Sequence, residues 1–345
     1  MARRTGDLSQ RASGETRREP EHPTAESARS RRGYKTLLKV GISGALLVWL
    51  ITQIDLTRTL TVLAHARKAG YLVALALFIV SVPIRAYRWK ILAEGLGLDV
   101  PIKKLTEFYF VGTFFNGVLP TGFGGDAIRA ADLAHHTGRA GESLGTVLID
   151  RFLGIIVLLA IGVGTLAFAG RPFERRLAWS LTIVLAIAVV GFWLLRRRKL
   201  LTRLARVVPP APRRLLESPV RALYTGLQGY PSGVLVRASL VSLVFNALWI
   251  GVNVLLGWSL GIDASIYHYL LFVPVVSLSL VIPSVGGLGV RELTYVGLFS
   301  LIGVARGTAF ALGIMVYAVT VATGLIGGLI LLANASREYL PLRDH

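Results

Sequence analysis

The chain has 345 residues, of which 53% are hydrophobic, and a mean hydropathy of +0.61, values that exclude an ordinary soluble globular domain. The formal net charge of +19 does not indicate nucleic acid as a partner, because the basic residues lie in an N-terminal leader and beside apolar runs, without a nucleic-acid-recognition motif. Cysteine is absent, which excludes disulfides, thiolate metal sites and a cysteine nucleophile.

Several apolar runs reach or approach the roughly 20 residues that a helix needs to cross a hydrocarbon core. The alternating pattern of a membrane barrel is absent. We therefore predict an all-α polytopic membrane protein with about six full transmembrane helices and two broken or re-entrant elements, eight hydrophobic segments in all. The predicted full spans are residues 36–54, 70–91, 146–169, 177–195, 234–260 and 308–333, and the broken elements are residues 105–129 and 267–304.

Composition divides the chain into three regions. Residues 1–33 are rich in Arg, Glu, Ser and Thr and are predicted to form a disordered basic cytoplasmic tail, because they cannot bury enough apolar surface to fold. Residues 34–338 form the predicted transmembrane domain, and residues 339–345 form a short cytoplasmic tail.

Charge in the loops predicts the orientation of this domain in the cell membrane. The positive-inside rule places both termini and the arginine-rich loop at 196–221 in the cytoplasm. Each half, residues 34–170 and residues 171–338, holds three predicted spans and one broken element, so the second half is inverted relative to the first. Arg85, Arg88 and Trp89, at the end of the second span, are predicted to lie at the membrane interface.

The first broken element contains an apolar run that is too short for a full crossing. Residues 105–119 would form about 22 Å of helix at 1.5 Å per residue, against a hydrocarbon core of roughly 30 Å. A re-entrant hairpin is therefore favoured.

Both broken elements carry a proline followed by a glycine pair and an arginine. Two such segments in matching places of two halves point to the binding site of a transporter. The first set is Pro120, Gly124, Gly125 and Arg129, and the second is Pro283, Gly286, Gly287 and Arg291.

Charged residues beside the first glycine pair suit phosphate binding. Asp126 and Arg129 are three residues apart and share a helix face. The start of a helix there presents free N–H groups, and Arg129 offers a planar fork to a phosphate. The alternative is that Asp126 and Arg129 only pair with each other and cap a re-entrant helix.

Five further polar residues are candidates for the same cavity. Arg151, which follows Asp150, is expected to face Asp126 or the cavity, or else to reach the interface. Arg291 and Glu292 form a second charged pair, in the second half of the chain. They are expected to face the cavity; the alternative is that they lie in a loop at the membrane interface. Asn116 is expected to satisfy backbone groups freed at the proline break or to contact a ligand.

Asn246 and Asn253 lie seven residues apart on one face of the fifth predicted span. Polar side chains of this kind hydrogen-bond across neighbouring helices inside membranes. They are therefore expected to join helices rather than to bind a substrate.

Three motifs in the sequence resemble those of a known family. They are F-x-N-x-x-L-P-x-G-x-G-G-D-x-x-R, which begins at Phe114, D-R at Asp150, and P-x-x-G-G-x-G-x-R-E, which begins at Pro283. The chain resembles the flippase-like membrane domain of the lysylphosphatidylglycerol synthase superfamily over residues 35–335, as a stand-alone member without the aminoacyl-transferase domain. The resemblance implies movement of lipids between leaflets, with an anionic phospholipid or a lipid-linked glycan as cargo.

The resulting hypothesis is a lipid transporter that holds a head group in a polar cavity near the membrane midplane. No catalytic residue, metal or cofactor is predicted, and no phosphate-loop ATPase motif is present, so movement would be downhill or coupled to protonation of Asp126, Asp150 or Glu292. Membrane lipids are the predicted partners, with a homo-oligomer or a separate lipid-modifying enzyme left open. The alternatives are a membrane enzyme acting on a lipid-linked substrate and a transporter of small water-soluble anions.

The predicted orientation can be tested by cysteine labelling, because the chain has no natural cysteine. We expect a Leu215→Cys variant in intact cells to stay unlabelled by a membrane-impermeant thiol reagent and to react after permeabilisation. Labelling in intact cells would place the loop outside and contradict the orientation.

Overall fold

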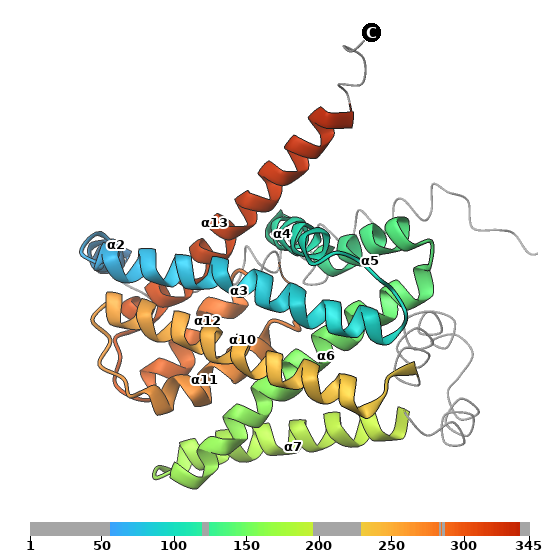
Figure 1. Ribbon diagram of the computed structural model, residues 1–345. Coiled ribbons are helices and arrows are strands. Elements are labelled where there is room, and N and C mark those ends of the chain that lie inside the picture. The colour runs from blue at the N-terminus through green and yellow to red at the C-terminus, as the bar shows by residue number, and fades with distance from the viewer. Residues whose placement is uncertain (1–55, 119–123, 196–228, 283, 285–286, 339–345) are drawn as a thin grey trace, which may run out of the picture. The chain divides into compact units, whose positions relative to one another are not determined.

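The computed structural model describes residues 56–118, 124–195, 229–282, 284 and 287–338 (Figure 1). The predicted tails, the first predicted span and the loop at 196–221 lie outside the described residues. So do three predicted site residues, Pro120, Pro283 and Gly286.

Every regular element among the described residues is helical, which confirms the predicted all-α fold. Five helices are long and apolar enough to cross a membrane, and they fall at the second to sixth predicted spans. The helices are α2 Leu56–Ala64, α3 Lys68–Gly95, α4 Ile102–Val118, α5 Gly124–Thr137, α6 Ala140–Gly164, the 3-10 turn η1 Thr165–Phe168, α7 Pro172–Leu195, α10 Ser232–Ser259, α11 Ile266–Ser279, α12 Val290–Ser300 and α13 Arg306–Glu338.

The structure adds one helix to the prediction and shifts several helix boundaries; α6, for example, begins at Ala140, six residues before the predicted start at residue 146. The polar stretch before the second span contains α2, which was not predicted. Helix α7 begins at Pro172, five residues before the predicted start at residue 177. The Glu174 carboxylate accepts hydrogen bonds from the backbone N–H groups of Gly170 and Arg171, both at 3.0 Å, and so satisfies donors at the helix start.

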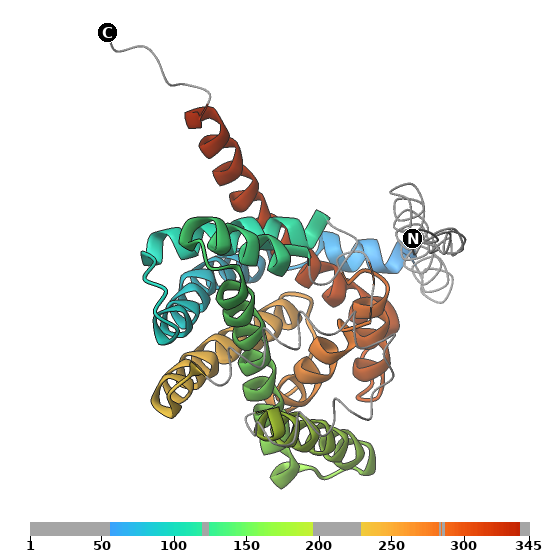
Figure 2. The ribbon, with the colours of Figure 1, turned by 90° about the vertical axis from the view of Figure 1, so that its right-hand side faces the viewer.

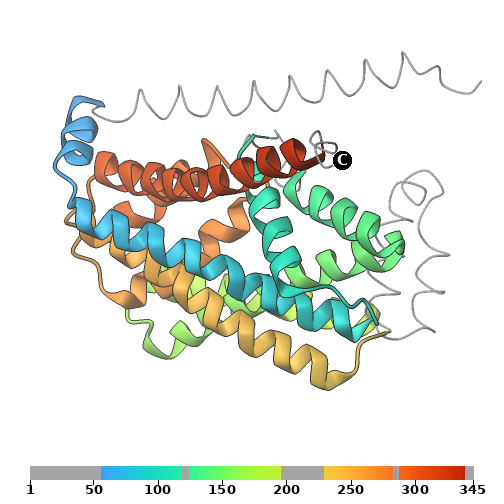
Figure 3. The same ribbon diagram turned by 45° about the horizontal axis from the view of Figure 1, so that its top comes forward.

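Helices α3 and α10 lie side by side and run in opposite directions (Figures 1 and 3). The start of α3 meets the end of α10, where the backbone N–H of Arg67 donates to the Ser259 carbonyl at 2.9 Å. At the other end, Gly95 packs against Tyr230, just before α10 begins. Helices α4, α6, α11 and α13 pack on one or both members of this antiparallel pair.

The same turn ends both helices. Residues 96–99 read Leu-Gly-Leu-Asp and residues 260–263 read Leu-Gly-Ile-Asp. Gly97 and Gly261 both have a φ of 71°, a left-handed backbone conformation that favours glycine. The hydrogen bonds also match: Leu98 N–H donates to Ala93 and Ile262 N–H donates to Gly257, both at 2.9 Å.

Each of these turns leads into a short apolar helix, α4 or α11. Helix α4 has 17 residues and is not long enough to be among the five candidate spans. Helices α4 and α5 lie side by side (Figure 2), and α5 leads through a second turn into α6. The first broken element is therefore a pair of helices that places the start of α5 against α4.

Helix α13 packs directly on the backbone of α4 through a row of glycines. A Cβ atom at Gly327 would overlap the Phe110 carbonyl oxygen, and one at Gly324 would lie 3.1 Å from the Phe114 Cα atom. Small residues allow this close approach of helices inside a membrane.

We expect Gly327→Ala to destabilise the folded protein by about 1–3 kcal/mol, because the added methyl group forces α13 away from α4. Thermal unfolding of the full chain in detergent measures the change. The matched control is Gly191→Ala in α7, where a Cβ atom meets nothing within 4 Å. Equal melting temperatures for the two variants would contradict this packing.

Candidate functional site

A cluster of charged side chains lies where α3, α4, α5, α6 and α10 meet. It contains four arginines and two aspartates, and we call it the arginine cluster. Its charged members are Arg85, Arg88, Asp126, Arg129, Asp150 and Arg151, and Tyr109 lies among them.

Asp150, on α6, is the centre of the cluster and is only 1% exposed. Arg88 Nε donates to its Oδ1 atom at 2.7 Å, and Arg129 Nη2 donates to its Oδ2 atom at 3.1 Å. The Tyr109 hydroxyl also donates to Oδ2. A carboxylate this deeply buried needs such partners, because the cost of desolvating a charge is several kcal/mol.

Arg88 connects three helices. Besides Asp150 on α6, it donates through Nη1 to the Ser242 hydroxyl on α10 at 3.0 Å. Asn246, one turn further along α10, donates to the Gly154 carbonyl of α6 at 3.0 Å, and so joins helices as expected. Arg88 and Trp89, which were predicted to lie at the membrane interface, are 3% and 0% exposed, so their side chains do not reach out from the protein as snorkelling residues would. The acid on a neighbouring helix explains the burial of Arg88.

Arg129 is as deeply buried as Arg88, with each residue 3% exposed. Its Nη1 atom donates to Asp126 at 3.2 Å, so the two residues share a helix face as predicted and also pair with each other, as the alternative had it. Its guanidinium carbon lies 3.5 Å from the centre of the Tyr109 ring and 4.3 Å from that of Trp89. Both terminal nitrogens hold carboxylates, so the fork of Arg129 is occupied in this structure.

The glycines before Asp126 allow α5 to begin against the backbone of α4. Gly124 and Gly125 are buried, and a Cβ atom at Gly125 would overlap the Gly112 carbonyl oxygen. Asn116 Oδ1 accepts a hydrogen bond from the Gly125 N–H at 2.9 Å. Asn116 thus satisfies a donor at the start of α5, which is the structural role expected for it.

Arg151 and Arg85 are the arginines at the margin of the cluster. Arg151 donates to Asp126, as expected, and its side chain is 32% exposed. Arg85 is half-buried, with its guanidinium carbon 4.8 Å from the ring centres of both Tyr109 and Phe245. Within the described residues Arg85 has no hydrogen bond or ion pair, and its buried Nε atom has no acceptor.

Arg85 was not predicted as a site residue. The signal in the sequence is an arginine pair, Arg85 and Arg88, spaced three residues apart inside an apolar helix. This spacing places both side chains on one face. Position near the end of a span favoured an interfacial interpretation instead.

A second polar site surrounds Glu292 on α12, and we call it the glutamate site. Arg291 and Glu292 are 6% and 0% exposed, so both lie inside the helix packing rather than on an exposed loop. Glu292 Oε2 accepts a hydrogen bond from the Gly289 N–H at 2.7 Å, and Arg291 lies 5.2 Å from the Tyr317 ring centre. Gly287 has a φ of 82°, and a Cβ atom there would lie 2.8 Å from Arg291 Nη2.

Helix α10 contributes to both sites. Ser242 contacts the arginine cluster, and Asn253 accepts a hydrogen bond from the Tyr295 hydroxyl in the glutamate site. This bond joins α10 to α12, as expected for Asn253. The two α10 residues are about 16 Å apart along the helix axis at 1.5 Å per residue.

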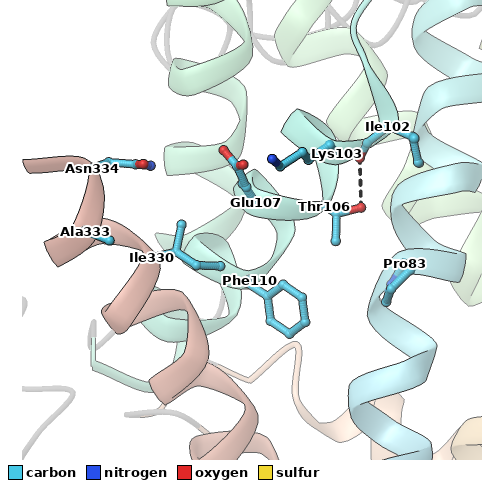
Figure 4. A pocket seen from close by; sticks show the side chains of 9 residues that line it. All are labelled: Pro83, Ile102, Lys103, Thr106, Glu107, Phe110, Ile330, Ala333 and Asn334. Carbon is cyan, nitrogen blue, oxygen red and sulfur yellow. Dashed lines mark hydrogen bonds between the residues drawn. The ribbon is translucent and has the colours of Figure 1, made fainter. Parts of the chain in front are cut away.

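A pocket of about 510 Å³ lies between α3, α4 and α13 (Figure 4). It uses the face of α4 that carries Thr106 and Phe110, whereas Tyr109 points into the arginine cluster. Its lining is apolar on one side and polar on the other. The apolar residues are Pro83, Ile102, Phe110, Ile330 and Ala333, and the polar residues are Lys103, Thr106, Glu107 and Asn334.

Several long apolar helices around buried charged groups define a multi-pass membrane protein. Residues 36–328 match the family described as the lysylphosphatidylglycerol synthase TM region, and the chain belongs to that family. It is similar to a UPF0104 membrane protein of Pyrococcus horikoshii, with 25% identity over 328 residues, which cover 87% of this chain and 97% of that relative.

We expect Asp150→Asn to destabilise the protein by about 3–5 kcal/mol, because Arg88 and Arg129 would stay buried without their shared carboxylate. Thermal unfolding in detergent measures the loss. Glu94→Gln is the matched control, since Glu94 pairs with Lys90 at 3.3 Å on an exposed helix face. Such a surface pair is worth at most about 1 kcal/mol. An Asp150→Asn variant as stable as this control would show that Asp150 does not hold the cluster together.

Proposed function

We propose that this protein moves a lipid with a phosphate-bearing head group between the leaflets of the membrane and that the arginine cluster binds the phosphate. The observation that carries the proposal is the charge of the cluster. Four arginines face two aspartates, which leaves an excess of positive charge beside apolar helices. Membership of the lysylphosphatidylglycerol synthase TM region family supports a membrane function related to lipids.

Arg85 and Arg151 are the residues that we assign to phosphate contact. Arg88 and Arg129 are held by Asp150, whereas Arg85 has no carboxylate partner within the described residues. Its guanidinium is held between two aromatic rings, which orients the group without using its donors. An anionic oxygen would supply the missing acceptor, and a planar guanidinium suits phosphate.

The role expected for Arg129 changes in this proposal. Its two terminal nitrogens hold Asp126 and Asp150, so it positions these carboxylates, although its Nε atom, like that of Arg85, has no acceptor within the described residues. Arg151 is the more exposed partner of Asp126 and can exchange that carboxylate for a ligand. A phosphate that enters beside Arg151 would also meet the glycine-rich start of α5.

Inverted repeats form part of the proposal, because they supply the alternating access that a transporter needs. Matching helices in the two halves would be α3 and α10, α4 and α11, α5 and α12, and α6 and α13. Contacts support this assignment: α4 packs on α13 as α11 packs on α6, and α5 packs on α6 as α12 packs on α13. The repeated turn after α3 and α10 supports it as well.

Two pockets occupy corresponding places in these proposed repeats. The pocket of Figure 4 lies between the start of α4 and the last turns of α13. A second pocket, of about 400 Å³, lies between the start of α11 and the end of α6. An apolar wall with a polar rim, as in the first pocket, suits an amphiphile such as a phospholipid.

We expect Arg85→Gln to slow lipid movement by roughly 10- to 150-fold below saturation, since a hydrogen bond to a charged group contributes about 1.5–3 kcal/mol. The measurement is the initial rate in phosphatidylcholine vesicles that contain a trace of head-group-labelled phosphatidylglycerol. Arg67→Gln is the matched control, because Arg67 also stacks on an aromatic ring, that of Trp258, but lies outside the cluster.

Parallel assays separate the candidate cargoes. A labelled polyprenyl phosphate sugar tests a lipid-linked glycan, and uptake of inorganic phosphate tests a water-soluble anion. Wild-type protein that moves neither lipid would refute the proposed function. Normal lipid movement by Arg85→Gln would refute the role of Arg85.

A further inference from the structure

Glu292 differs from the other buried carboxylates of the protein. Asp150 accepts hydrogen bonds from two arginines and a tyrosine, and Asp126 from two arginines. Glu292 is 0% exposed, and within the described residues its Oε2 atom accepts the Gly289 N–H at 2.7 Å. Its Oε1 atom is buried and has no hydrogen-bond partner within the described residues.

The groups around Glu292 come from four helices. Arg291 and Tyr295 lie on α12 itself, and the Tyr295 hydroxyl donates to Asn253 of α10 rather than to Glu292. The Tyr269 ring of α11 packs against Phe299 one turn beyond Tyr295. On α13, the groups are the Tyr317 ring, which faces Arg291, and the backbone at Gly313, where a Cβ atom would lie 3.2 Å from the Glu292 Cα atom.

An ionised carboxylate with one unsatisfied oxygen is unfavourable in such a place. Arg291 supplies opposite charge nearby, but it donates no hydrogen bond to Oε1 within the described residues. The energetic cost of burying this oxygen as an anion is relieved when the carboxylate takes up a proton. A metal cation would need several oxygen or nitrogen ligands. The described residues contain no group of three His, Cys, Asp or Glu side chains that could hold a metal.

From this geometry we infer that Glu292 takes up and releases the proton that couples lipid movement to a proton gradient. The inference rests on the proposed function, which left the driving force open. Asp126, Asp150 and Glu292 were the three candidates for protonation. The inference favours Glu292, because arginines pair with Asp126 and Asp150, while Glu292 has an oxygen without a hydrogen-bond partner within the described residues.

Protonation would change the structure at the start of α12. The Gly289 N–H at present donates to a carboxylate oxygen, and a charge-assisted bond of this kind is about twice as strong as a neutral one. Uptake of a proton therefore weakens the contact that fixes this helix end. Gly289 has a φ of 83°, so the turn that it forms depends on glycine.

Two helices connect this change to the arginine cluster. Helix α10 contacts Tyr295 through Asn253 and Arg88 through Ser242. Helix α13 packs on Glu292 at Gly313 and on α4 at Gly327. A movement of α12 against either helix would reach the phosphate-binding site.

The first experiment measures the proton at Glu292 directly. Infrared difference spectra of the purified full chain, taken between acidic and alkaline buffer, are expected to show a carboxylic acid C=O band that Glu292→Gln abolishes. Glutamine is chosen because its amide oxygen can still accept the Gly289 N–H. Glu142→Gln, at an exposed acid paired with Arg139, is the matched control and should leave the band unchanged. A spectrum of Glu292→Gln identical to that of wild type would overturn the proton site.

The second experiment measures coupling. Initial rates with head-group-labelled phosphatidylglycerol are compared with and without an imposed pH gradient. We expect the gradient to change the wild-type rate, Glu292→Gln to give equal rates, and Glu292→Asp to keep a response because it still titrates. A wild-type rate that ignores the gradient would overturn the coupling. If wild-type protein moves no lipid although the infrared band titrates, the proposed function fails and the proton site at Glu292 stands.

Discussion

The interaction of Asp150 with Arg88 and Arg129 sets the arrangement of the first half of the protein. The three residues belong to α6, α3 and α5, and Tyr109 adds α4 through the second carboxylate oxygen. A buried ion pair contributes little net stability, but removal of one partner is strongly unfavourable. The cluster therefore restricts which packings of these helices are tolerated, and at the same time it retains a positive charge that an anion can neutralise.

Hydropathy and turn residues were sufficient to predict the fold class, because the length of an apolar run directly reports a membrane span. Five of the predicted spans coincide with apolar helices. The shared turn at Gly97 and Gly261 was not predicted, although residues 96–99 and 260–263 differ at one position only. Helix α2 was not predicted, because it has only nine residues and its threonines and arginine lie between its apolar residues. A short helix gives too few periods for the pattern to be recognised.

The candidate site was predictable only in part, because its members lie on helices that are distant in sequence. Asp126 and Arg129 are neighbours on one helix, so spacing alone paired them. Arg88 and Asp150 are 62 residues apart, and no local pattern connects them. Position near a helix end then suggested an interfacial arginine, whereas the carboxylate on α6 makes burial the better solution. Pairs such as Arg88 and Asp150 are brought together by the packing of helices, which the periodicity of a single helix does not reveal.

The two buried polar sites of the domain differ in their chemistry. In the first half, Asp126 and Asp150 neutralise some of the arginines, and the surplus is positive. In the second half, Arg291 stacks near Tyr317 while Glu292 keeps one oxygen without a hydrogen-bond partner within the described residues. A phosphate suits the first environment and a proton suits the second. Helix α10 contacts both sites, and α13 packs on Glu292 and on α4, which carries Tyr109 of the arginine cluster. In the proposed transport, these helices would let a change of charge at one site alter the energy of conformations at the other.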